Sequence, residues 1–295
     1  MATRTAVIPA AGMGTRFLPA TKAVPKELMP IFDTPVLQLV IDEAVAAGCD
    51  HVVVVSSASK PAIEEYLSPS DDVVRRVRDT GRTDLAERLA RIGRDVRVTI
   101  ALQDRPRGLG HAVACARDVV GDEHVAVLLP DEIMGDASLL TTLAAVAEDT
   151  GGTTVALKSV PMAETSSYGV VTLGDAVGAR GERPVTGVVE KPAPGTAPST
   201  LVIIGRYVLA PEMFDLLEHV EPAPNGEIYL TDALLAGARA GRVFGLESAV
   251  DRFDTGTPMG WLQAAIELVA RRPDVGPAFD EWLGARGTPP ESSSR

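Results

Sequence analysis

Three basic side chains follow a glycine-containing loop near the N-terminus, and together they could bind a polyanion. The loop, residues 10–16, reads Ala-Ala-Gly-Met-Gly-Thr-Arg. Its glycines let the backbone approach a ligand, and its consecutive N–H groups can form an anion-binding nest. With Arg16, Lys22 and Lys26 as cations, the pattern indicates a triphosphate site. The alternative is a tight turn and a solvated charged loop, in which Lys22 has no role.

Two commoner phosphate-binding motifs do not fit this loop. A dinucleotide fingerprint requires a third Gly or Ala at the position where the chain has Phe17. A Walker A loop would end in Gly-Lys-Ser or Gly-Lys-Thr, and this loop does not. A nicotinamide-dependent dehydrogenase is therefore supported only by this weak Gly-Met-Gly match and by the alternation of strands and helices described below.

Asp131 stands at the end of an apolar segment, directly after Pro130, where it could hold a metal ion. Magnesium prefers hard oxygen ligands and keeps several waters, so one or two carboxylates and phosphate oxygens suffice. By itself, an aspartate at the end of a strand is more often a turn residue or a helix cap.

The charge balance excludes some partners and draws attention to the lysines. With 28 basic and 40 acidic residues, the chain has a formal net charge of −12, which argues against a nucleic-acid or anionic-membrane binder. There are 23 arginines but only 5 lysines, a ratio typical of a coding bias towards arginine. A lysine that persists at a phosphate site has a chemical reason, because a compact ammonium is not readily exchanged for a planar guanidinium.

Targeting and redox features predict a soluble cytoplasmic protein. Cys49 and Cys115 form no CxxC motif, the four histidines show no metal-binding spacing, and the N-terminus has no signal-peptide architecture. No apolar run approaches the roughly 20 residues that span a bilayer.

The elements that must position these residues alternate between strands and helices. Apolar strand-length segments are predicted at 5–9, 51–56, 96–102, 125–129 and 153–157, and helices at 36–47, 110–119 and 139–147. This order predicts a doubly wound parallel sheet, in which ligands bind at the carboxyl ends of the strands. Residues 68–95 are rich in charge and are expected to form a solvated helical excursion.

The second half has shorter predicted strands and ends in a tail. We expect strands at 169–172, 186–189 and 201–208, and helices at 212–218, 230–240 and 258–270. The Pro- and Ser-rich segment 287–295 is expected to be mobile.

Several segments in order resemble one known family. The run 7–22 continues through Lys26-Glu27, and further matching segments are 108–113, 128–131, 167–171, 188–192, 205–208 and 226–233. Together they resemble the bacterial UTP–glucose-1-phosphate uridylyltransferase family, within the sugar-phosphate nucleotidylyltransferase superfamily. The resemblance extends to about Arg271.

The resemblance implies a Rossmann-like, doubly wound, mixed but mainly parallel α/β sheet of the nucleotide-diphospho-sugar transferase type, with a smaller β-rich sugar-binding part. It implies one domain, 1–272, with a nucleotide-binding part at about 1–160 and a sugar-binding part at about 161–272. Residues 273–295 would form a C-terminal extension with a flexible tail. Relatives are dimers or tetramers, so a homo-oligomer is expected.

The reaction implied is UTP plus α-D-glucose 1-phosphate giving UDP-glucose and pyrophosphate. The sugar phosphate attacks the α-phosphorus in line with the help of Mg²⁺, and no covalent enzyme intermediate is required. Positioning and charge neutralisation would supply most of the catalysis.

The resemblance also implies roles for individual residues. Arg16, Lys26 and Asp131 would be catalytic, the two cations holding the departing pyrophosphate, and Asp131 and Asp254 would bind Mg²⁺. Nucleotide contacts would come from Ala10, Ala11, Gly12, Gly14, Gln103 and Gly108, with Gln103 reading the pyrimidine. Sugar-phosphate contacts would come from Gly169, Glu190 and Lys191, while Glu227 and Asp232 are lesser candidates. Asp232 is expected to order the start of a helix, and Asp254 is equally compatible with a structural turn.

Two departures keep alternatives open. The segment Asp254-Thr255-Gly256-Thr257 is more typical of glucose-1-phosphate thymidylyltransferases, and Glu132 follows Asp131 where valine is commoner. A thymidylyltransferase, or a nucleotidyltransferase for another sugar 1-phosphate, is therefore the nearest alternative. A noncatalytic nucleotide-sugar sensor is a different class, but it would have lost a phosphate-binding cation or a metal carboxylate, and this chain retains these residues.

Overall fold

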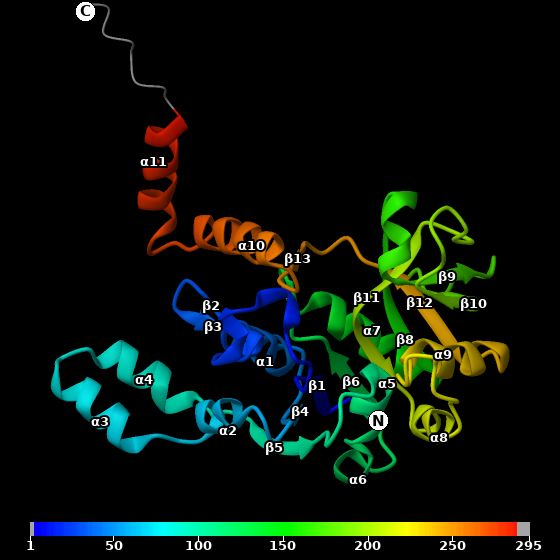
Figure 1. Ribbon diagram of the computed structural model, residues 1–295, viewed down its shortest axis with the longest axis horizontal. Coiled ribbons are helices and arrows are strands. Elements are labelled where there is room, and N and C mark those ends of the chain that lie inside the picture. The colour runs from blue at the N-terminus through cyan, green and yellow to red at the C-terminus, as the bar shows by residue number, and fades with distance from the viewer. Residues whose placement is uncertain (1–2, 288–295) are drawn as a thin grey trace, which may run out of the picture.

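A nine-stranded sheet forms the centre of the computed structural model, which describes residues 3–287 (Figure 1). The strand order is β5-β4-β1-β6-β11-β8-β12-β10-β9. The bounds are β1 Thr5–Pro9, β4 His51–Ser56, β5 Arg97–Leu102, β6 Val125–Leu128, β8 Thr153–Ser159, β9 Gly169–Leu173, β10 Arg183–Glu190, β11 Leu201–Leu209 and β12 Val243–Glu247.

The sheet is mixed, and its two halves differ. Strands β5, β4, β1 and β6 pair in parallel, as does β12 with β8. Strand β11 pairs antiparallel with both β6 and β8, and β10 pairs antiparallel with β12 and β9. The chain is therefore an α/β protein, and the mainly parallel pairing expected from the sequence is found only in the N-terminal half.

Helices cover both faces of the sheet because successive strand residues point to opposite sides. Ala6 and Ile8 of β1 belong to a buried cluster with α1 (Val36–Ala46) and α7 (Ser138–Thr150). Val7 belongs to a second cluster with α5 (Gly108–Ala114), α8 (Glu212–Glu218) and α9 (Leu230–Arg239). The first half of the chain thus buries its apolar strands on two sides, as the uninterrupted valines of β4 predict.

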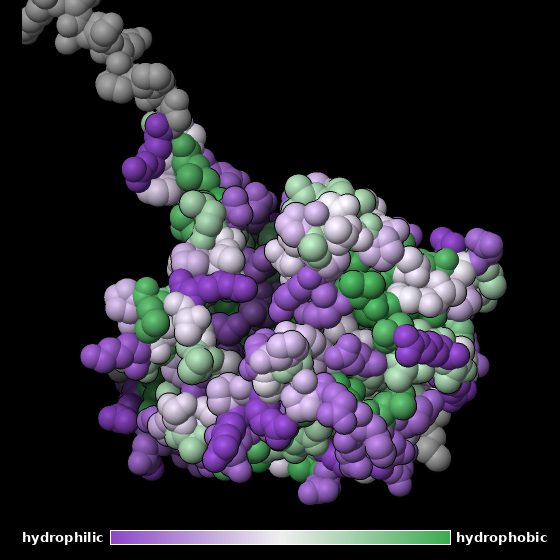
Figure 2. Space-filling view, turned by 45° about the vertical axis from the view of Figure 1, so that its right-hand side comes forward, coloured by the Kyte–Doolittle hydropathy of each residue, from purple (hydrophilic) through white to green (hydrophobic). Residues whose placement is uncertain are grey.

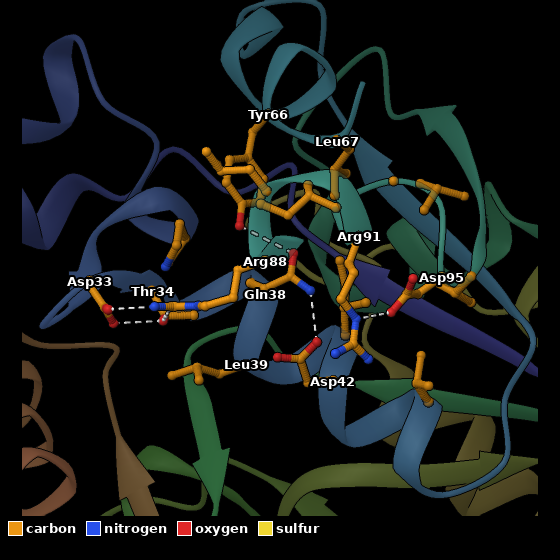
Figure 3. A pocket seen from close by; sticks show the side chains of 18 of the residues that line it. Asp33, Thr34, Gln38, Leu39, Asp42, Tyr66, Leu67, Arg88, Arg91 and Asp95 are labelled. Carbon is orange, nitrogen blue, oxygen red and sulfur yellow. Dashed lines mark hydrogen bonds and ion pairs between the residues drawn. The ribbon is translucent and has the colours of Figure 1, made fainter. Parts of the chain in front are cut away.

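The charged excursion folds into paired helices beside α1. It contains α3 (Asp71–Asp79) and α4 (Thr83–Arg91), which follow α2 (Pro61–Leu67). A cavity of about 540 Å³ lies between α1 and α4 (Figure 3). Its polar side chains pair with one another, as in the hydrogen bond from Tyr66 to Gln38 and the ion pair of Arg88 with Asp33.

Two short ribbons and a C-terminal helix were not expected from the sequence. Strands β2 (Pro30–Ile31) and β3 (Thr34–Pro35) form one ribbon, and β7 (Glu132–Met134) pairs with β13 (Arg252–Asp254) to form the other. Helix α10 (Pro258–Ala270) is followed by α11 (Gly276–Gly287). Apart from Gly287, the predicted mobile tail lies outside the described residues. None of the helices within 3–287 has the length and apolar character needed to cross a bilayer.

Arg206 of β11 is the largest fully buried side chain and uses all five of its N–H donors. Two of them hold the carboxylate of Glu43 on α1, with distances of 2.8 Å and 2.6 Å. The others reach the carbonyls of Leu129, Glu132 and Gly205. This guanidinium therefore binds backbone carbonyls at both ends of the turn between β6 and β7, which carries Asp131.

Replacing Arg206 by methionine should lower the free energy of unfolding by about 3–5 kcal/mol, because the Glu43 carboxylate would remain buried without a partner. Urea unfolding followed by circular dichroism measures this change. The double variant R206M/E43M should recover a large part of the loss, since both charges are then removed. A loss of less than about 1 kcal/mol in R206M would contradict this role.

Candidate active site

A cleft of about 370 Å³ opens at the carboxyl ends of β1, β5 and β6. Its lining comes from the glycine loop, from Lys26 and Glu27, from Gln103 and Gly108, and from Asp131. The strand order places these strands close together, so residues far apart in the sequence meet where ligands bind in such sheets. Figure 2 shows that the surface is hollowed beside the C-terminal helices and that hydrophilic side chains border the hollow.

The glycine loop presents unpaired backbone donors to this cleft. Within residues 3–287, the N–H groups of Ala11, Gly12, Met13 and Gly14 donate to no protein acceptor. Gly14 has a φ of +62°, and a Cβ there would lie 3.2 Å from the Thr21 methyl. A Cβ on Gly12 would meet nothing within 4 Å, so the space above the loop is open to a ligand. Ala10, the first residue of the loop, is fully buried.

Of the three predicted cations, Lys26 is held in the site and the other two are exposed. The Lys26 ammonium lies 2.7 Å from the Asp131 carboxylate. Burial raises the pKa of this carboxyl, but Lys26 and, more weakly, Arg16 outweigh it, so the pKa of Asp131 lies below its ordinary value. Arg16 and Lys22 form no ion pair within the described part of the chain, and their side chains are free to contact a ligand.

The β7–β13 ribbon brings the two predicted metal ligands together. It pairs Asp254 with Glu132, and the N–H of Thr255 donates to the carbonyl of Asp131 at 2.8 Å. A Cβ on Gly256 would lie 3.1 Å from Asp254 Oδ1 and 3.2 Å from Asp131 Oδ2. The two carboxylates therefore flank one small space that the glycine leaves open.

This donor set fits a divalent cation that keeps other ligands. Asp254 Oδ1 also accepts the N–H of Gly256 at 2.7 Å, so this aspartate forms a structural turn as well. Residues 3–287 contain no group of three or more His, Cys, Asp or Glu side chains that could hold a metal. Two carboxylates with water or phosphate oxygens match the preference of Mg²⁺.

Gln103 is oriented by a histidine that the sequence reasoning did not assign. Its side chain is buried, and Nε2 lies 2.8 Å from His111 Nδ1 and 3.2 Å from the carbonyl of Gly108. Burial and the charge of Arg107 lower the pKa of His111, which keeps the ring neutral and its Nδ1 able to accept. The amide oxygen of Gln103 takes no donor within residues 3–287, and it is left for a ligand.

Gly108 is required for the fold as well as for the expected close contact with a nucleotide base. Its φ is +88°, and a Cβ would lie 2.9 Å from the carbonyl of Ile228. The neighbouring Glu227 lines the cleft. Asp232 lies in the first turn of α9, as expected, and is exposed.

A second cluster contains the predicted sugar-phosphate residues. Gly169 pairs with Glu190 across β9 and β10, and Thr231 donates to Glu190 Oε2 at 3.0 Å. Lys191 has a φ of +42°, and its ammonium lies 3.3 Å from Glu190 Oε1 and 5.6 Å from the centre of the Tyr229 ring. A Cβ on Gly169 would lie only 2.7 Å from the Thr231 methyl.

The residues of this cluster are separate from the lining of the 370 Å³ cleft. Burial raises the pKa of Tyr207 on β11, and the carboxylates of Glu132, Glu190 and Asp131 raise it further. The predicted sugar-phosphate residues thus form a polar cluster of their own.

Four residues that contact the site were not assigned a role from the sequence: Lys60, Glu27, Arg206 and His111. Two features of the sequence could have pointed to them. Lysine is scarce, which singles out Lys60, and the other three lie in segments that match the family. None of them could be placed from the sequence, because their partners lie elsewhere in the chain: Glu27 for Lys60, Gln103 for His111, and Glu43 for Arg206.

Known proteins resemble this chain over most of its length. Residues 5–270 match the model of a family described as nucleotidyl transferase. The chain is 42% identical over 267 residues to the UTP–glucose-1-phosphate uridylyltransferase of Bacillus subtilis (strain 168), which covers 90% of each protein.

Solved structures are similar over nearly the whole chain. A UTP-bound UGPase from Acinetobacter baumannii has a TM-score of 0.87 and 33% identity, covering 95% of this chain and 98% of that one. A UDP-glucose pyrophosphorylase complexed with UDP-glucose has a TM-score of 0.83 and 32% identity, covering 92% of this chain and 100% of that one. The chain belongs to the nucleotidyl transferase family.

Proposed function

We propose that this protein transfers a uridylyl group from UTP to α-D-glucose 1-phosphate, giving UDP-glucose and pyrophosphate. The observation that carries the proposal is the convergence of unpaired loop N–H groups and the Lys26–Asp131 pair in one cleft, with the space at Gly256 next to the Asp131 carboxylate. The UTP-bound and UDP-glucose-bound structures of relatives support this choice of substrate and product.

The chain's own residues divide the work between two anionic substrates. The N–H groups of Ala11–Gly14 would hold the nucleotide phosphates, while Arg16 and Lys26 neutralise the departing pyrophosphate. Asp131 and Asp254 would hold Mg²⁺, which when bound supplies positive charge to the phosphate oxygens. Holding both substrates in line for attack on the α-phosphorus then requires no covalent enzyme intermediate.

Neutral groups would recognise the base, and charged groups would recognise the sugar phosphate. Gln103 Oε1 can accept the N–H of uracil because its Nε2 is already committed to His111. Glu190 would accept hydrogen bonds from sugar hydroxyls beside Gly169, and Lys191 would bind the phosphate of glucose 1-phosphate. On this proposal residues 1–160 form a Rossmann-like nucleotide-binding part, and 161–272 form the sugar-binding part.

The setting of the enzyme is part of the proposal. We infer a homo-oligomer and a cytoplasmic location, with residues 273–295 as a C-terminal extension of the domain. The free thiols of Cys49 and Cys115 support a reducing compartment.

The direct test measures pyrophosphate release from each of the four NTPs and from dTTP, with several sugar 1-phosphates and Mg²⁺. We expect the highest kcat/KM with UTP and glucose 1-phosphate. A preference for dTTP would make the protein a thymidylyltransferase. UTP binding without turnover for any sugar phosphate would instead indicate a nucleotide-sugar sensor.

Substituting alanine for Gly256 should disturb the metal site without removing a ligand. The methyl group would lie within 3.2 Å of both the Asp131 and the Asp254 carboxylates, so the Mg²⁺ concentration for half-maximal rate should rise about tenfold or more. Gly284→Ala is the matched control, because nothing lies within 4 Å of a Cβ there. An unchanged Mg²⁺ titration in G256A would remove this carboxylate pair from the metal site.

Uridine recognition should weaken at low pH because protonated His111 cannot accept a hydrogen bond from Gln103. The folded pKa of His111 lies below its ordinary value of 6.5, so KM for UTP should stay constant from pH 8 to about 6.5 and rise at lower pH. The unfolded chain binds this proton more readily, so stability is also lost in that direction. His111→Asn should flatten the KM profile, whereas His219→Asn should leave it as in the wild type.

A further inference from the structure

Lys60 is a buried lysine at the start of α2 to which the proposed reaction gives no role. Its side chain is 9% exposed, and its ammonium lies 2.8 Å from Glu27 Oε2 and 2.7 Å from the carbonyl oxygen of Ala10. Glu27 is still more buried, at 1%. One ammonium therefore joins the glycine loop, the segment that carries Lys26, and the loop after β4.

The bond to Ala10 has a geometric consequence for the next residue. The peptide unit between Ala10 and Ala11 is planar and trans, so its C=O and N–H point in opposite directions. With the carbonyl bound by Lys60, the N–H of Ala11 must point away from Lys60. Ala11 lines the cleft, and its N–H donates to no acceptor within residues 3–287.

The bond to Glu27 fixes the neighbouring cation. Lys26 and Glu27 are adjacent, and their side chains enter different ion pairs, with Asp131 at 2.7 Å and with Lys60 at 2.8 Å. Because Lys60 anchors Glu27, it restricts the backbone from which Lys26 reaches Asp131. The loop donors and the Lys26 ammonium are thus positioned by the same group.

We propose that Lys60 is a positioning residue for nucleotide phosphate binding, acting through the Ala10 carbonyl and through Glu27. This inference rests on the proposed function, since it assigns UTP to the cleft. Scarcity of lysine in an arginine-rich chain agrees with it, because a bulkier guanidinium would not fit a buried site shaped for one ammonium.

The test compares UTP affinity and KM for Lys60→Met and for Lys158→Met, the same substitution at a lysine of β8 outside the site. K60M should weaken UTP binding, measured by calorimetry with Mg²⁺, roughly 10-fold to 100-fold, as expected for losing a charged hydrogen bond. KM for glucose 1-phosphate should stay near the wild-type value, and K158M should match the wild type in both. Equal UTP affinity in K60M and K158M would overturn the inference.

A second variant separates positioning from charge compensation. K60M leaves the Glu27 carboxylate buried without a partner, so part of its effect could be loss of stability. The double variant K60M/E27Q removes that charge and should regain thermal stability, yet its UTP affinity should remain low because the Ala10 carbonyl is still unbound. Recovery of wild-type UTP affinity in K60M/E27Q would refute the role of Ala10.

The wild-type measurement distinguishes the two proposals. If the wild-type protein bound no UTP, the proposed function would fail, whatever the variants did. If the wild type binds UTP and K60M binds it equally well, only the role of Lys60 is lost.

Discussion

The buried guanidinium of Arg206 is the constraint on which the site depends. Burying a charge is favourable only where partners satisfy it, and here Glu43 supplies the countercharge while three carbonyls take the remaining donors. The carbonyls of Leu129 and Glu132 lie on either side of the turn that carries Asp131, and that of Gly205 lies on β11, so α1, β11 and this turn are held in one geometry. In the proposed metal site, Asp131 would lose little freedom on binding its ion because its backbone is already fixed.

The negative net charge of the chain is compatible with the binding of anionic substrates, because the net charge describes the whole molecule and binding depends on the few groups in the cleft. The chain carries a net charge of −12, and in the cleft Lys26 is paired with Asp131 while Lys60 binds the loop carbonyl of Ala10. On the proposed function these lysines and a bound cation would offset the charge of the nucleotide phosphates, while the negative charge of the whole chain disfavours polyanions such as nucleic acid.

Apolar runs predicted the strands and a local motif predicted the glycine loop, while the family resemblance put Lys26 and Asp131 in one site, where their side chains form an ion pair. The prediction from sequence overestimated the share of parallel strand pairs. Strands β9 to β12 have the same apolar character whether they pair parallel or antiparallel. The sequence did not reveal the double role of Gly108, whose Cβ would meet Ile228, or the hydrogen bond from Lys60 to Ala10. Those features depend on contacts between segments far apart in the chain, which no local pattern encodes.

The β7–β13 ribbon also has a consequence for how the protein becomes functional during synthesis. Glu132 pairs with Asp254, so the ribbon closes a loop of more than one hundred residues that includes most of the second half of the sheet. Contacts of such high sequence separation form late, because the intervening chain must be ordered first. A nascent chain that has completed β1 to β6 therefore has the glycine loop but not Asp254, so the two proposed metal ligands meet only when the fold is complete.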